Sequence, residues 1–195
     1  MNTHHKGWYS RGYLPHFDRP HRIQGLTFRL ADSLPFHIVD ALAQDPEIHN
    51  DTQRPTRIET HLNTGYGACY LREPHIGQLV EDALLHFDKE RYQLIAWVVM
   101  PNHVHGLIET IEGYPLGGIV HSWKSFTANE ANRRLRRQGA FWFPDYFDRY
   151  IRNQQHLENA IRYIHNNPVK AGLVDRPEAW PFSSARLWEP YAPCG

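Results

Sequence analysis

The stretch that most constrains the fold is the apolar run Tyr92–Met100, which a second β-prone run follows after two residues. The run YQLIAWVVM is apolar almost throughout, which predicts a buried central strand rather than a half-solvated one. Pro101-Asn102 is a turn signal. His103–Thr110 then predicts the antiparallel return strand. A central β-hairpin therefore anchors the expected fold.

Strands and helices alternate around this hairpin. The periodicity predicts a strand over Ile23–Leu30, helices over Pro74–Lys89, Ile119–Gln138 and Gln155–Lys170, and an extended stretch over Phe141–Ile151. This mixture predicts an α+β fold in which an antiparallel sheet carries its helices on one face. The expected organisation is one domain over 1–195, with its core in 23–174, an insertion of about 32–68 after the first strand and a tail over 175–195. Residues 1–22 are aromatic and basic with Gly and Pro, and we expect irregular structure there.

Charge is balanced overall but not along the chain. Lys plus Arg and Asp plus Glu each number 21. Residues 121–170 contain nine basic and four acidic side chains, a local balance of +5, whereas residues 31–60 contain two and six, a balance of −4. A locally positive region can attract a polyanion, although a solvated helix face would explain the same pattern. The candidate DNA contacts are Lys124, Arg133, Arg134, Arg136, Arg137, Arg149 and Arg152 for phosphates and Trp142 for stacking on unpaired bases.

Cysteine usage and hydropathy exclude some classes. The two cysteines, Cys69 and Cys194, form neither a disulfide framework nor a cysteine-based zinc site. No run approaches the roughly 20 apolar residues that a membrane helix needs. We therefore expect a soluble, cytoplasmic protein without a membrane partner.

The first candidate chemical motif is His103-Val104-His105, at the start of the predicted return strand. Residues i and i+2 of a strand project to the same side, about 7 Å apart along the chain. Two imidazoles so placed can converge on one cation, while Val104 points into the core. Two surface histidines on a strand face are the alternative interpretation.

The second candidate lies on the last predicted helix. Tyr163 and Asn167 are i and i+4 and share one helix face. The amide oxygen of Asn167 is a reasonable ligand for a hard divalent ion, and the phenol of Tyr163 would then project beside the same metal. Taken alone, a helical tyrosine is more often a packing residue, and Asn167-Pro168 is a helix-ending signal.

Together these residues resemble the REP-associated tyrosine transposases, which are related to insertion-sequence transposases with a single catalytic tyrosine. The motifs that carry the resemblance span nearly the whole chain: GWYSRGYLPHFDRP (7–20), TFRLADSLP (27–35), AWVVMPNHVHGLIE (96–109), SWKSFT (122–127), YFDRYIRN (146–153), YIHNNPVKAGLV (163–174) and WPFSSAR (180–186). The resemblance implies a ferredoxin-like fold with a His-hydrophobic-His (HUH) motif on a central strand. It also implies Tyr163 as the nucleophile, and His103, His105 and Asn167 as metal ligands.

The resemblance further implies metal-dependent cleavage and rejoining of single-stranded, hairpin-forming palindromic DNA through a 5′-phosphotyrosine. Mg²⁺ or Mn²⁺ is the expected cofactor, and hairpin DNA near the nucleoid is the expected partner of a monomer or homodimer. Two other functions stay open. A zinc hydrolase would use the histidine pair with a metal-bound water, and a non-catalytic protein would bind repetitive DNA without cleaving it.

Overall fold

The computed structural model describes residues 5–10, 15–35, 38 and 53–187. Part of the expected insertion (36–37 and 39–52) and Cys194 lie outside the described residues. The strands are β1 (Gly7–Ser10), β2 (Pro15–Asp18), β3 (Ile23–Arg29), β4 (Tyr92–Val99), β5 (His103–Thr110) and β6 (Phe147–Tyr150). The helices are α2 (Gln53–Leu62), α3 (Pro74–Leu85), α4 (Leu116–Arg134) and α5 (Gln154–Lys170), with short 3₁₀ helices η1 (Tyr70–Arg72), η2 (Pro177–Ala179) and η3 (Ser184–Leu187).

The main sheet has four antiparallel strands in the order β4-β5-β3-β6. With α3 between β3 and β4 and α4 between β5 and β6, the chain follows the β-α-β-β-α-β order of a ferredoxin-like fold. The predicted α+β class and the central position of the His103–Thr110 strand are thus confirmed. The hairpin forms as expected: Val104 is fully buried, and Met100 N–H donates to the carbonyl of His103 across the turn.

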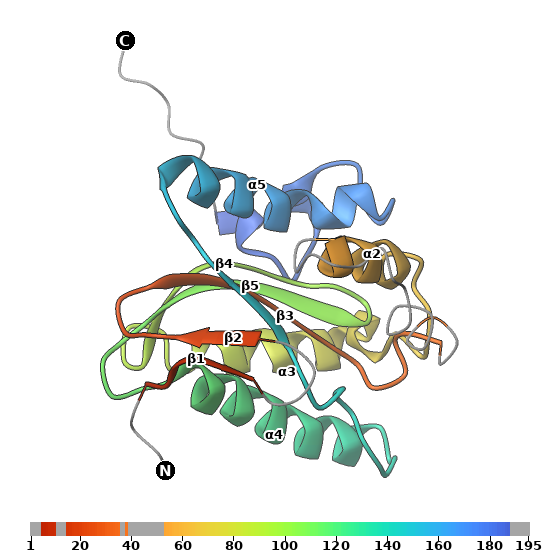
Figure 1. Ribbon diagram of the computed structural model, residues 1–195. Coiled ribbons are helices and arrows are strands. Elements are labelled where there is room, and N and C mark those ends of the chain that lie inside the picture. Colours follow the sequence, from red (N-terminus) through yellow and green to blue (C-terminus); the bar gives the residue numbers. More distant parts are fainter. Residues whose placement is uncertain (1–4, 11–14, 36–37, 39–52, 188–195) are drawn as a thin grey trace.

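The expectation that helices cover one face only is wrong. Figure 1 shows α3 and α4 on one side of the sheet and α5 on the other. Phe28 of β3 packs toward α4, with its ring centroid 6.3 Å from that of Trp123. His105 of β5 packs toward α5, with its ring centroid 5.5 Å from that of Tyr163. Side chains along a strand alternate between the two faces of the sheet. The buried strands carry apolar or aromatic side chains on both faces, so helices must pack on both faces to exclude water.

Two further segments differ from the sequence prediction. Residues 7–10 and 15–18 pair as the antiparallel strands β1 and β2 rather than forming irregular structure, with Trp8 opposite Phe17. Buried His16 joins this strand pair to the main sheet through Asp145 and Asp148. The extended stretch after residue 141 yields only the four-residue β6. Before β6, an isolated Leu30–Trp142 bridge lies beside the end of β3, and Phe143 N–H donates to the carbonyl of Arg29.

β4 is buried as predicted, but it is an edge strand of the sheet and not a central one. The C-terminal segment covers its outer edge. Val99 N–H donates to the carbonyl of Phe182, and the indole N–H of Trp180 donates to the carbonyl of Val99. Ser183 forms a bridge with Val98. An edge strand exposes unpaired backbone groups, and these contacts satisfy several of them. The described helices include none long and apolar enough to cross a membrane.

Candidate active site

The two histidines of the motif lie side by side on the α5 face of the sheet. Their Nε2 atoms are 3.1 Å apart, and the side chains are 0% and 4% exposed. The antiparallel register places His105 opposite Thr27 and His103 opposite Arg29, so the motif lies between β3 and β4 rather than at a sheet edge. Since metal–imidazole bonds are about 2.1 Å long, one cation can contact both Nε2 atoms.

Asn102 determines which nitrogen of His103 faces the site. Its amide Nδ2 donates to the carbonyls of Leu62 and Tyr66, which leaves its Oδ1 toward His103 Nδ1 at 2.8 Å. A carbonyl oxygen only accepts, so Nδ1 of His103 is the protonated nitrogen and Nε2 keeps its lone pair. Such an outer partner is typical of metal-binding histidines.

Thr27 plays the corresponding part for His105, with its Oγ1 2.8 Å from Nδ1. A hydroxyl can donate or accept, so Thr27 supports either tautomer of His105. Burial and the neighbouring His105 hold the pKa of His103 well below its ordinary value, and burial lowers the pKa of His105 to about 3. Both imidazoles are therefore neutral at physiological pH, the form that binds metals.

Helix α5 places Tyr163 next to His105, and Asn167 follows one turn later on the same helix face. Tyr163 packs edge-on against His105, and Lys170 Nζ lies 4.8 Å from the centroid of its ring. Tyr163 Oη and Asn167 Oδ1 are buried and have no hydrogen-bond partner among the described residues. Buried polar atoms without partners are uncommon and need an explanation. Two of them on the helix that packs against neutral imidazoles fit a cation and a phosphate oxygen as the missing partners.

The helix continues past the helix-ending signal Asn167-Pro168 and reaches Lys170, as its periodicity predicted. Pro168 lies inside α5, which continues to Lys170 and is capped at Ala171, whose N–H donates to the carbonyl of Asn167. Proline leaves the carbonyl four residues earlier without its usual donor. The helix therefore keeps Tyr163, Asn167 and Lys170 in one continuous rod.

Glu59 is a site residue that sequence reasoning missed. It comes from α2, within the expected insertion, and accepts a hydrogen bond from Asn167 Nδ2 at 3.0 Å. Burial raises the pKa of Glu59 to about 7, although the Asn167 bond and Lys170 act in the opposite direction. No periodicity or motif distinguishes this carboxylate from its acidic neighbours, because only the folded chain brings residues 59 and 167 together.

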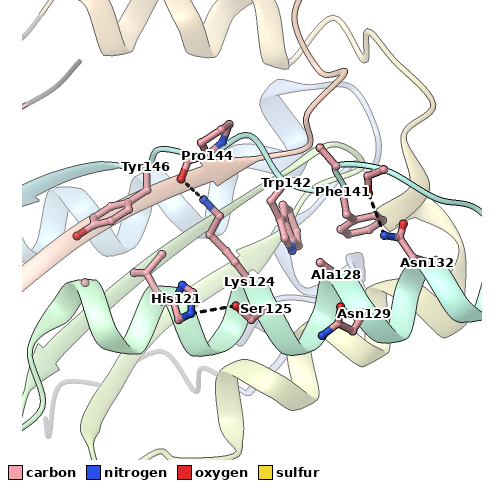
Figure 2. Close-up of a pocket in the computed structure, with 14 residues that line it drawn as sticks. His121, Lys124, Ser125, Ala128, Asn129, Asn132, Phe141, Trp142, Pro144 and Tyr146 are labelled. Atoms are coloured by element: carbon pink, nitrogen blue, oxygen red, sulfur yellow. Dashed lines mark hydrogen bonds between the residues drawn. The ribbon is translucent and has the colours of Figure 1, made fainter. Parts of the chain in front are cut away.

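Two of the predicted DNA contacts have structural roles instead. Figure 2 shows Lys124 and Trp142 among the residues that line a cavity over α4, whose volume is about 430 Å³. Helix α4 lies across the sheet from α5, which packs against His105 (Figure 1). The Lys124 ammonium donates to the carbonyls of Phe143 and Pro144 at 2.7 Å. Trp142 is buried, and its indole N–H donates to Thr127. A phosphate or a base would have to displace these contacts, so we correct both assignments.

The remaining basic candidates fall into two groups. The first group lies at and just beyond the C-terminal end of α4, a helix across the sheet from α5, and consists of Arg133, Arg134, Arg136 and Arg137. Arg149 of β6 lines a cavity together with Tyr163, and both Arg149 and Arg152 are close enough to His156 to lower its pKa, after burial as the main cause. The second group thus lies on the site's face of the sheet. DNA contact by either group stays a prediction.

The fold and the site define a ferredoxin-like domain with a His-hydrophobic-His pair facing a helical tyrosine. Residues 73–167 match the family model described as "Transposase IS200 like". The matched segment resembles that family, and it includes both histidines, Tyr163 and Asn167. The resemblance to REP-associated tyrosine transposases is also confirmed by individual relatives.

The chain is 30% identical over 112 residues to the REP-associated tyrosine transposase of Escherichia coli (strain K12), which covers 55% of this chain and 63% of that protein. It is 29% identical over 104 residues to a putative REP-associated tyrosine transposase of Haemophilus influenzae (strain ATCC 51907 / DSM 11121 / KW20 / Rd), covering 48% of this chain and 58% of that protein. The chain therefore matches less than two thirds of either relative. A REP-associated tyrosine transposase solved with a REP hairpin shares the fold, with a TM-score of 0.60, 20% identity, and 92% of this chain and 82% of that chain covered.

Proposed function

We propose that this protein cleaves and rejoins single-stranded DNA through a covalent bond between Tyr163 and a DNA phosphate. One observation carries the proposal. The Tyr163 ring packs against His105, and its buried hydroxyl has no partner among the described residues. A phenol used only for packing would normally have a hydrogen-bond partner when buried.

The phenol oxygen of Tyr163 attacks the phosphorus, and the bond from phosphorus to the 3′ oxygen breaks. The phenol proton leaves, the 3′ oxygen gains a proton, and the 5′ phosphate stays on Tyr163. Attack by a 3′-hydroxyl reverses these steps and joins strands, so no nucleotide cofactor is required. Lys170, above the Tyr163 ring, favours the negative charge that develops on the phenol.

His103, His105 and Asn167 would hold a divalent cation, Mg²⁺ or Mn²⁺. When bound, such an ion neutralises charge on the phosphate oxygens and orients the phosphorus. Among the described residues, no group of three or more His, Cys, Asp or Glu side chains could hold a metal. The third ligand proposed is therefore the amide oxygen of Asn167, which is buried and has no hydrogen-bond partner among the described residues. This donor set is weaker than the one that a zinc hydrolase needs.

The DNA substrate is proposed from the relatives, since one solved REP-associated tyrosine transposase is bound to a REP hairpin. We propose hairpin-forming, palindromic single-stranded DNA for this chain as well, and hence action at the nucleoid. Tyr163 contacts His105 of its own chain, which supports the proposal that Tyr163 acts in the site of its own chain.

The proposal is tested by incubating the protein with single-stranded hairpin DNA and Mn²⁺ or Mg²⁺, followed by denaturing electrophoresis. A covalent protein–DNA band is expected from the unmodified protein and from Tyr114→Phe, an exposed-tyrosine control. The band should be absent from Tyr163→Phe and His103→Ala. Equal bands in all four proteins would refute the assignment of Tyr163. DNA binding without any band would favour a non-catalytic binding protein.

A further inference from the structure

A cavity of about 340 Å³ opens beside Tyr163, between the sheet and helices α2 and α5. One face of α5 forms its roof, through His156, Asn159, Ala160 and Tyr163. These residues follow the i, i+3, i+4, i+7 spacing of a single helix face. The chemistry proposed above does not use this space.

The floor of the cavity is open because β3 has a glycine there. Gly25 has no side chain, and its two nearest contacts for an added Cβ would be Arg149 O at 3.8 Å and Leu107 Cδ1 at 4.0 Å. Both are ordinary van der Waals distances, so a side chain fits without a clash. Its outer atoms would enter the cavity. Glycine weakens a strand interior and often marks a place where a ligand approaches the backbone.

The walls and the rim of the cavity differ in character. Ile58 and Leu62 of α2 and Ile151 supply apolar surface, whereas His156 and Asn159 supply groups that can donate and accept hydrogen bonds. Arg149 adds positive charge at the end that His156 also lines, and Arg152 lies nearby. The other end holds Tyr163 and His105. His156 and Tyr163 are seven positions apart along α5, which corresponds to about 10 Å along the helix axis.

We propose that this cavity binds the base of a nucleotide adjoining the phosphate that Tyr163 attacks, and that Arg149 and Arg152 hold the next phosphate. A base presents flat apolar faces to the aliphatic walls and hydrogen-bonding edges to His156 and Asn159. A pocket that takes an unpaired base requires that base to be unstacked, which is least costly in single-stranded DNA. This inference rests on the proposed function. It adds that the protein itself recognises one base next to the cleaved phosphate.

The test combines one protein change with one DNA change. Gly25→Val fills the cavity with a residue that suits a strand. In the DNA, an abasic residue is placed at each position around the cleaved phosphate in turn. Affinity is measured by fluorescence anisotropy in the Tyr163→Phe background, which binds without cleaving. The control variant is Gly118→Ala on α4, whose added Cβ meets only Pro115 Cγ at 3.8 Å.

One abasic position adjoining the cleaved phosphate is expected to weaken binding about 5- to 150-fold, the range for losing one stacked base. Gly25→Val should weaken binding to intact DNA by a similar factor and remove most of the dependence on that position. Gly25→Ala, which fills less space, should give a smaller loss, and Gly118→Ala none. Melting curves check that each variant is folded.

Equal affinity for all abasic oligonucleotides would overturn the inference. A Gly25→Val protein whose affinity still depends on the abasic position as strongly as that of the parent would also overturn it. These results concern binding alone, so they are distinct from loss of the covalent band, which would refute the proposed chemistry and leave the pocket intact. Absence of any DNA binding would overturn both.

Discussion

Removing the positive charge of His16 should make the stability of this protein less dependent on pH above neutrality. His16 is fully buried on β2 and contacts Asp148 through Nδ1 and Asp145 through Nε2, the latter at 3.2 Å. Asp148 also accepts hydrogen bonds from Phe17 N–H and Gln24. The cluster ties the β1–β2 strand pair to β6, the strand that presents Arg149 to the cavity.

The size of the effect follows from the pKa of His16. Burial disfavours the charged ring, but the hydrogen bonds and charges of Asp145 and Asp148 outweigh it and raise the pKa from 6.5 to about 9. That difference corresponds to about 3 kcal/mol of stability. Because the folded state holds the proton more tightly, this contribution is fully present below pH 6.5. It falls by about 1.4 kcal/mol per pH unit above that and is lost once the pH has passed about 9.

The measurement is the free energy of unfolding in urea at several pH values between 6 and 9.5, for the unmodified protein and for His16→Gln. Subtracting the two curves cancels the other titrating groups. The difference should be largest at pH 6 and shrink by about 3 kcal/mol toward pH 9.5. His75→Gln, a substitution of an exposed histidine on α3, should run parallel to the unmodified protein. If His16→Gln does not fold, Asp145→Asn removes one of the two partners and should reduce the same slope.

A difference between the curves that stays constant with pH would refute the reasoning, because it would mean that the pKa of His16 is the same in the folded and the unfolded protein. A difference that grows with pH would show that burial outweighs the two carboxylates.

Two further predictions concern the site and the core. Glu59→Leu should weaken Mn²⁺ binding, measured by calorimetry, about 10- to 100-fold, because Asn167 loses the acceptor that orients its amide. Glu59→Gln, which can still accept that hydrogen bond, should recover most of the affinity, and equal losses in both variants would contradict this role. Gly77→Ala should destabilise the protein by about 1–3 kcal/mol in urea unfolding, because an added Cβ would lie 2.5 Å from Phe182 Cε2. A stability equal to that of the parent would show that the tail moves aside freely.

Sequence periodicity predicted the secondary structure correctly where the local conformational preference of a segment and its burial in the fold favour the same element. The run at Tyr92–Thr110 is too apolar to lie anywhere but in the interior, and Pro101-Asn102 sets a turn whatever surrounds it. The alternation of side chains along a strand then requires His103 and His105 to share a face. The i, i+4 spacing of Tyr163 and Asn167 follows equally from helix geometry. The candidate ligands could therefore be named without the fold.

Tertiary structure alone decided what surrounds those residues. The local sequence around Glu59, Thr27 and Gly25 does not identify them as parts of a site. Glu59 and Thr27 act through hydrogen bonds to residues distant in sequence, Asn167 and His105. Gly25 acts through the space that its missing side chain leaves open. Conversely, Lys124 and Trp142 are residue types that often contact nucleic acids. In the fold, however, Lys124 donates to backbone carbonyls and Trp142 donates to the buried hydroxyl of Thr127. A side chain's type limits its possible partners, but the packing of sheet and helices determines which of them lies within reach.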